Sequence, residues 1–182
     1  MRVDIWSDVV CPFCYIGKKR LEAVAKEAEI ELEIHWHSYQ LDPEAPQSQS
    51  ISNTERLAQK YGRTLAEVEE MQRNIADMAK AEGIEFNWQH ANSGNTFNAH
   101  RLIHLAQSKG LGNEAQEALF YSYMTQGLKI GERETLEDVA ARIGLNPVEV
   151  DDLLDGNEFA DFVEFDQEVA REQLKVTGVP FF

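Results

Sequence analysis

Two short segments near the start of the chain alternate between apolar and polar residues, and a helical repeat separates them. Residues 2–6 (RVDIW) and 31–37 (ELEIHWH) carry an apolar side chain at every second position, which is typical of β-strands. Residues 21–28 (LEAVAKEA) repeat with a period near 3.6, which indicates a helix. This order predicts a β-α-β unit with parallel strands. Because the second strand is polar on its other face, we expect it at an edge of the sheet.

A segment rich in proline and serine, residues 42–53, marks a boundary after this unit. Beyond it, apolar residues recur with helical spacing over most of the remaining chain. Start and stop signals predict helices over residues 64–83, 96–109, 113–126, 135–143, 147–155 and 158–175.

Local signals also predict where some of these helices begin and which side chains they bury. Capping boxes are expected at Thr64 with Glu67 and at Thr135 with Asp138, and Asn146 before Pro147 resembles an N-cap. The helix after Thr64 should turn one face to the core, formed by Leu65, Val68, Met71, Ile75 and Met78. The last helix should bury Phe159, Phe162, Val163, Val169 and Ala170.

The final residues, VTGVPFF, have the apolar character of a buried strand at its beginning. A strand at this position would have no element after it. We therefore expect the C-terminal strands and helix of the fold to be missing from this chain.

The composition is that of a soluble globular protein, with 43% hydrophobic residues and nine phenylalanines. No apolar run approaches the roughly 18 residues of a membrane span, and Met1 leads directly into the alternating segment rather than into a secretion signal. We therefore expect a cytoplasmic protein. The formal net charge of -15 disfavours nucleic acid and anionic membrane surfaces as partners.

The two cysteines of the chain, Cys11 and Cys14, occur together in the stretch VCPFCY. A structural disulfide is disfavoured, because closing so short a loop constrains the unfolded chain very little. A zinc site would need two further ligands, for which the chain offers only histidines: His35, His37, His90, His100 and His104. Since HRLIH lacks the glutamate of HExxH, we predict no metal site. A redox pair is the favoured interpretation.

The position of the two thiols predicts different roles for them. Cys11 falls at the start of the first helix, with Pro12 in its first turn. Free backbone N–H groups and the helix dipole there favour the thiolate, so we expect a lowered pKa for Cys11. Cys14 lies one turn further on, between Phe13 and Tyr15, and should be more buried. Cys11 should therefore attack a disulfide, and Cys14 should resolve the mixed disulfide.

Four segments together resemble a known family: CPFC at 11–14, NTFNAHRL at 95–102, TLEDVAARIGL at 135–145 and VTGVPFF at the end. They resemble the thioredoxin superfamily, and within it the DsbA-like thiol:disulfide oxidoreductases of the FrnE type. The resemblance implies an α/β, thioredoxin-like fold with a large all-helical insertion. Its thioredoxin-like domain would comprise residues 1–45 and 158–182, with the inserted helical domain at 46–157.

The resemblance also implies the binding residues. Pro180 would be a cis-proline beside the cysteines, and Val179 would offer main-chain groups to an extended substrate. Pro12 and Phe13 would contact substrate and tune the redox potential. DsbA carries a histidine between its cysteines, which Phe13 cannot imitate. We therefore expect a potential less oxidising than the about -120 mV of DsbA.

The activity implied is that of a thiol-disulfide oxidoreductase or disulfide isomerase acting on protein or small-thiol substrates. It needs no cofactor besides its redox-active disulfide, and glutathione is a candidate co-substrate. An alternative comes from relatives that place serine at the position of Cys11, the 2-hydroxychromene-2-carboxylate isomerases and kappa-class glutathione transferases. The segment 95–100 recurs in them, so a glutathione-dependent isomerase or transferase is the second hypothesis. The sequence does not predict the oligomeric state.

Overall fold

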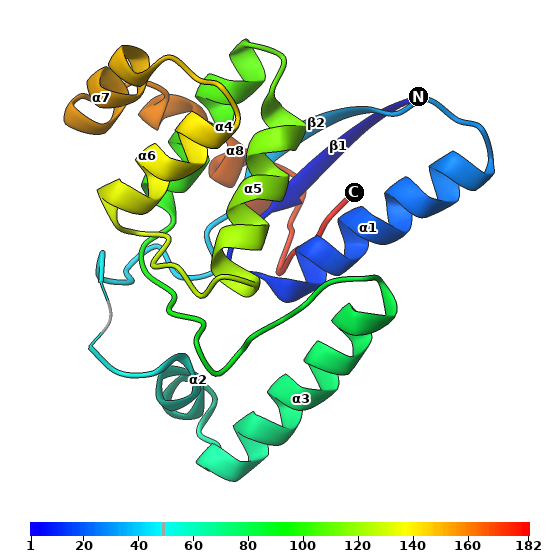
Figure 1. Ribbon diagram of the computed structural model, residues 1–182, viewed down its shortest axis with the longest axis vertical. Helices are drawn as coiled ribbons and strands as arrows, with labels where there is room; N and C mark the ends of the chain where they lie inside the picture. Colours follow the sequence, from blue (N-terminus) through cyan, green and yellow to red (C-terminus); the bar gives the residue numbers. More distant parts are fainter. Residues whose placement is uncertain (49) are drawn as a thin grey trace.

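The first part of the chain forms the predicted β-α-β unit in the computed structural model, which describes residues 1–48 and 50–182. Strands β1 (Arg2–Ser7) and β2 (Glu33–Ser38) pair in parallel, and helix α1 (Pro12–Glu27) connects them (Figure 1). In the register of the two strands, Trp6 of β1 is opposite His37 of β2. The strand order and direction predicted from periodicity are confirmed.

The rest of the described chain is mainly helical. After β2 come α2 (Asn53–Tyr61), α3 (Leu65–Ala81), α4 (Phe97–Ser108), α5 (Gly112–Met124), α6 (Arg133–Arg142), α7 (Pro147–Asp155), α8 (Ala160–Glu168) and a π-helical turn, η1 (Val169–Gln173). Helix α2 was not predicted, although Ser52 and Glu55 form a capping box at its start.

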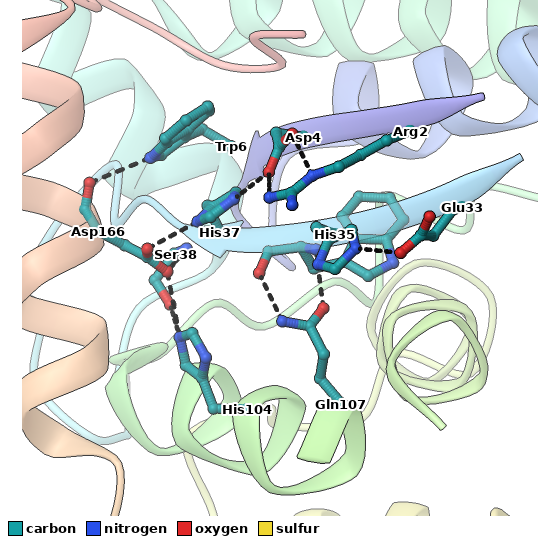
Figure 2. A network of polar contacts seen from close by, with 11 residues as sticks. Arg2, Asp4, Trp6, Glu33, His35, His37, Ser38, His104, Gln107 and Asp166 are labelled. Atoms are coloured by element: carbon teal, nitrogen blue, oxygen red, sulfur yellow. Dashed lines mark hydrogen bonds and ion pairs between the residues drawn. The ribbon is translucent and has the colours of Figure 1, made fainter. Parts of the chain in front are cut away.

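Helices α4, α5 and α8 pack against β2, whereas α2 and α3 lie apart from the sheet, beyond the end of β1 where α1 begins (Figure 1). The free edge of β2 is covered by a side chain of α4. Gln107 accepts a hydrogen bond from the N–H of Trp36 at 2.9 Å and donates one to its carbonyl at 3.4 Å (Figure 2). The backbone N–H and carbonyl of Trp36 on the open edge of the strand are thereby satisfied.

Two predicted helix starts are confirmed and one is wrong. Thr64 caps α3 in a capping box with Glu67, and the Asn146 side chain accepts from the N–H of Val148 at the start of α7. Helix α6 does not begin at Thr135 but at Arg133, with Glu132 as its N-cap. Thr135 lies within the first turn of α6 and its side chain is buried, so it does not serve as the N-cap.

Some predicted inward-facing residues are exposed. Helix α3 buries Val68, Gln72, Ile75 and Ala79, and this stripe leaves Leu65 and Met78 toward solvent. Phe162 of α8 is 53% exposed, because the helix turns Val163 and the polar Asp166 inward instead. Asp166 is buried because polar groups of β2 and α4 surround its carboxylate, a long-range arrangement that periodicity does not reveal.

A main hydrophobic core connects the β-α-β unit with the later helices. It includes Ile5 and Trp36 from the strands, Leu102 from α4 and Phe120 from α5, together with both cysteines. The core therefore contains residues from both predicted domains, and the division into 1–45 with 158–182 and 46–157 stays a prediction. Of the residues described, no helix combines the length and the apolar character that crossing a membrane requires.

The end of the chain returns to β1. Phe181 forms an antiparallel bridge with Trp6, in which the N–H of Trp6 donates to the Phe181 carbonyl at 2.9 Å and the N–H of Phe181 donates to the Trp6 carbonyl at 3.2 Å. The strand predicted from VTGVPFF is therefore represented by this single bridge among the described residues. It places residues 179–181 beside the end of β1.

Candidate active site

Both cysteines lie at the start of α1. Cys11 is the N-cap residue, Pro12 occupies the first turn, and Cys14 lies one turn into the helix. The N–H of Cys11 donates to the carbonyl of Asp8 at 3.0 Å, which anchors the loop before the helix. Both thiols are free and buried, whereas the ring of Phe13 between them is 44% exposed. A partner molecule can therefore contact Phe13 directly.

The surroundings shift the pKa values of the two thiols in opposite directions. A hydrogen bond from Cys14, with further ones from the backbone N–H groups of Cys14 and Phe13, holds the pKa of Cys11 below its ordinary value despite burial. Burial, reinforced by the neighbouring Cys11, raises the pKa of Cys14 well above its ordinary value. A helix N-terminus stabilises a thiolate in the same way. These pKa shifts have the directions expected if Cys11 is the attacking thiol and Cys14 the resolving thiol.

The structure brings Val179 and Pro180 to the cysteines. The Cys11 Sγ donates to the Val179 carbonyl at 3.6 Å, although 168 residues separate the two in sequence. The Val179–Pro180 peptide bond is cis, as the resemblance implies. Pro180 packs directly on Gly17 of α1, where an added Cβ would come within 3.3 Å of the Pro180 Cγ atom. The absent side chain at Gly17 thus permits the close approach of this segment.

A cavity of about 220 Å³ opens on another side of Cys11. Pro12 and Phe13 belong to its lining, and its other walls come mainly from α2, α3 and the segment before α4. Val179 and Pro180 are not part of this lining. Two of the predicted binding residues therefore line the cavity, whereas Val179 contacts Cys11 and Pro180 packs on Gly17, both outside the lining.

The lining of this cavity includes polar groups with unused hydrogen-bonding capacity. Gln72 and Asp8 are both buried, and among the described residues Gln72 Oε1 and Asp8 Oδ1 have no hydrogen-bond partner. Arg56 and Lys60, one turn apart on α2, also line the cavity, and Arg56 is ion-paired at 3.0 Å with Asp42 of the same lining. The lining therefore offers acceptors to an N–H donor and cations to a carboxylate.

Asp8 and His100 form a buried pair below the cysteines that sequence reasoning missed. The Asp8 Oδ2 atom accepts from the N–H of Leu41 at 2.8 Å, while Oδ1 lies 3.5 Å from the Nε2 atom of His100. Both side chains are at most 2% exposed. Among the described residues, neither the Asp8 Oδ1 atom nor the His100 Nε2 atom has a hydrogen-bond partner. The sequence feature that could have identified Asp8 as a neighbour of the cysteines is its position three residues before Cys11.

Three of the five histidines considered as metal ligands lie beside other polar side chains. His104 contacts Ser38 and Asp166, His100 faces Asp8, and His35 contacts Glu33. Within residues 1–48 and 50–182, no three histidine, cysteine or acidic side chains gather as a metal site would require.

Comparison with known proteins identifies the family. The sequence profile of the DSBA-like thioredoxin domain matches residues 2–182. A probable DsbA oxidoreductase from Streptomyces coelicolor is 32% identical, with a TM-score of 0.92 over 100% of this chain and 79% of that chain. At this similarity the relationship extends beyond a shared fold.

More distant structures share the fold alone. A 2-hydroxychromene-2-carboxylate isomerase is 18% identical with a TM-score of 0.70, over 100% of this chain and 85% of that one. The cytosolic disulfide reductase DsbM from Pseudomonas aeruginosa, also solved with GSH, is 17% identical with a TM-score of 0.68, over 99% of this chain and 82% of that one. The predicted thioredoxin-like α/β fold is confirmed, and the chain belongs to the DsbA-like thioredoxin family.

Proposed function

We propose that this protein is a thiol-disulfide oxidoreductase or disulfide isomerase of the FrnE type, with Cys11 and Cys14 as its redox pair. The observation that carries the proposal is the position of the Cys11 thiol, which caps α1, contacts the Val179 carbonyl and borders a cavity. The family supports it, because it includes disulfide oxidoreductases.

In the proposed reaction, the Cys11 thiolate attacks one sulfur of a substrate disulfide. A Cys11–substrate bond forms, the substrate S–S bond breaks, and the leaving sulfur departs as a thiolate that takes up a proton. Cys14 then loses its proton and attacks the Cys11 sulfur, which releases the second substrate sulfur. The substrate gains two electrons and the Cys11–Cys14 pair becomes a disulfide, which two equivalents of a small thiol can reduce again. The same steps in reverse would oxidise a dithiol.

The proposed substrate surface consists of Pro12, Phe13, Val179 and Pro180. Phe13 offers an exposed ring at the cavity, and the Val179 carbonyl lies beside Cys11 outside the cavity lining. An extended peptide that carries a disulfide can contact both. The proposed partners are therefore disulfide-containing proteins or small thiols, rather than nucleic acid or membranes. A cytoplasmic location, in line with the cytosolic relative, would favour reduction or isomerisation.

The test is reduction of a disulfide substrate such as insulin in the presence of dithiothreitol. Cys11→Ser should reduce the rate to that of dithiothreitol alone, because no attacking thiolate is left. Cys14→Ser should retain the attack but accumulate a mixed disulfide with the substrate, visible by mass spectrometry. Full activity of Cys11→Ser would rule the proposal out.

A second candidate function is glutathione-dependent isomerisation or transfer, and the cavity favours it. Its acceptors, Asp8 Oδ1 and Gln72 Oε1, and its cations, Arg56 and Lys60, match the ammonium, amide and carboxylate groups of a small peptide thiol. Glutathione would equally serve the first function as a co-substrate. Calorimetric titration with glutathione tests binding, and Arg56→Gln should weaken it. Turnover that survives Cys14→Ala would favour the isomerase, whereas loss of turnover would favour disulfide exchange.

A further inference from the structure

His37 on β2 lies between two carboxylates, away from the cysteines (Figure 2). Its Nδ1 atom is 2.7 Å from the Asp166 Oδ1 atom, and its Nε2 atom is 3.0 Å from the Asp4 Oδ1 atom. A neutral imidazole has one N–H and can donate to only one of them. The doubly protonated ring donates to both, so this geometry favours the imidazolium.

The other charged and titratable groups around His37 and its two carboxylates come from β1, α4 and β2. On β1, Arg2 forms two hydrogen bonds with the Asp4 carboxylate. On α4, the His104 Nε2 atom lies 3.2 Å from the Asp166 Oδ2 atom. Further along β2, His35 pairs with Glu33. Burial alone would lower the pKa of His37, but its hydrogen bonds to Asp166 and Asp4 outweigh burial and raise it.

His37 and Asp166 both contact the side chain of Trp6. The His37 ring stacks on the Trp6 indole with ring centroids 4.3 Å apart and an interplanar angle of 15°. The Trp6 Nε1 atom donates to the backbone carbonyl of Asp166 at 3.1 Å (Figure 2). The position of the Trp6 side chain therefore depends on the His37–Asp166 pair.

Trp6 in turn holds the segment that contacts Cys11. Its backbone makes both hydrogen bonds of the bridge with Phe181, and Val179 and Phe181 pack on the small apolar cluster around Trp6. The Val179 carbonyl, two residues before Phe181, accepts from the Cys11 Sγ. A continuous series of contacts thus connects His37 to the thiol.

We propose that His37 and Asp166 are positioning residues, which hold the Val179 carbonyl against the Cys11 thiol through Trp6 and Phe181. An acceptor beside the S–H group stabilises the neutral thiol, so release of Val179 lowers the pKa of Cys11. Protonated His37 maintains the contact, and loss of its proton at higher pH weakens it. The meaning of this coupling for catalysis rests on the proposed function, but the coupling itself is a property of one thiol.

The test compares His37→Gln with His35→Gln, a matched substitution two residues away on the same strand. The readout is the rate at which iodoacetamide alkylates Cys11 as a function of pH, measured by mass spectrometry of the full chain. At pH values below the midpoint of the alkylation profile, Cys11 of His37→Gln should react about two- to fivefold faster than Cys11 of the wild type, the effect of losing one weak S–H···O contact. His35→Gln should match the wild type. An unchanged profile in a folded His37→Gln protein would overturn the proposal.

A measurement on the wild-type chain decides the matter if His37→Gln does not fold. Coupling is reciprocal, so alkylation of Cys11 must change the pKa of His37. NMR titration of the His37 Cε1–H signal should give different midpoints before and after alkylation, and equal midpoints would overturn the proposal. Neither assay uses a disulfide substrate, so a protein inactive toward insulin can still confirm or refute the coupling.

Discussion

The carbonyl oxygen of Val179 lies 3.6 Å from the Sγ atom of Cys11, and this contact joins the two ends of the described chain. It gives the Cys11 thiol a backbone acceptor, while the backbone N–H groups of Cys14 and Phe13 at the helix N-terminus face the Cys11 thiolate. The surroundings of Cys11 therefore include both local and distant groups.

The opposite pKa shifts of the two thiols predict selective alkylation. At pH 7, iodoacetamide should label Cys11, whose pKa is lowered from its ordinary value, and leave Cys14, whose pKa is raised, unmodified. Peptide mass spectrometry of briefly treated, reduced protein measures both sites. Denatured protein serves as control, because both cysteines should then react alike. Equal labelling of the two sites in the folded protein would contradict the assignment of roles.

The residue between the cysteines predicts the redox potential. Because Phe13 cannot stabilise the Cys11 thiolate by charge, the potential should lie nearer the about -180 to -230 mV of isomerases and glutaredoxins than the about -120 mV of DsbA. Equilibration with glutathione buffers measures it. Phe13→His should make the protein more oxidising, since an imidazolium beside the thiolate stabilises the reduced form. A Phe13→Leu control should leave the potential close to the wild-type value.

Gly17 predicts a steric requirement of the site. A β-branched side chain there would displace Pro180, whose Cγ atom lies 3.3 Å from the position of an added Cβ. Gly17→Val should lower the free energy of unfolding by about 1–3 kcal/mol, the usual effect of overpacking, and reduce disulfide exchange. Urea denaturation and the insulin assay measure the two effects. Ala23→Val, at an exposed position of the same helix, controls for helix propensity; an equal loss in both variants would argue against the contact.

The buried carboxylate of Asp166 predicts how stability depends on pH. Burial raises its pKa, but hydrogen bonds from His104, His37 and the N–H of Ser38 outweigh this and lower the pKa to about 2. The contribution of Asp166 to stability is therefore present above about pH 3.9, the pKa of an aspartate in the unfolded chain, and is lost as the pH falls toward 2. His37 has a raised pKa, so its contribution is present below about 6.5 and is lost as the pH rises through the folded value.

Asp166→Asn should consequently lower the free energy of unfolding most between about pH 5 and 6.5, where Asp166 and His37 are both charged. The expected loss is about 2 kcal/mol, the usual contribution of hydrogen bonds to a charged group. The difference from wild type should shrink at pH 3 and at alkaline pH. Urea denaturation at each pH measures it. The exposed Asp161→Asn on the same helix should change little at any pH, and a pH-independent loss in Asp166→Asn would refute the ionic explanation.

The local part of the fold could be predicted from the sequence because it depends on neighbouring residues. Alternation and helical repeats determine the β-α-β unit, and Thr64 with Glu67 caps α3 through contacts only three residues apart. The placement of Cys11 at a helix start likewise needs only Pro12 and the apolar repeat behind it. Cysteine count and spacing alone favoured a redox pair.

Other features were decided by the tertiary structure. Asp8, His37 and Asp166 look like ordinary polar residues in sequence, and only packing against residues more than thirty positions away gives each its partner. Periodicity predicted that Phe162 is buried, whereas the helix buries Asp166 instead, and hydrogen bonds from His104 and His37 offset the desolvation of its carboxylate. The sequence by itself determined which local elements form and which two thiols make up the candidate redox pair; only the folded chain decided what faces them, because those contacts join distant segments.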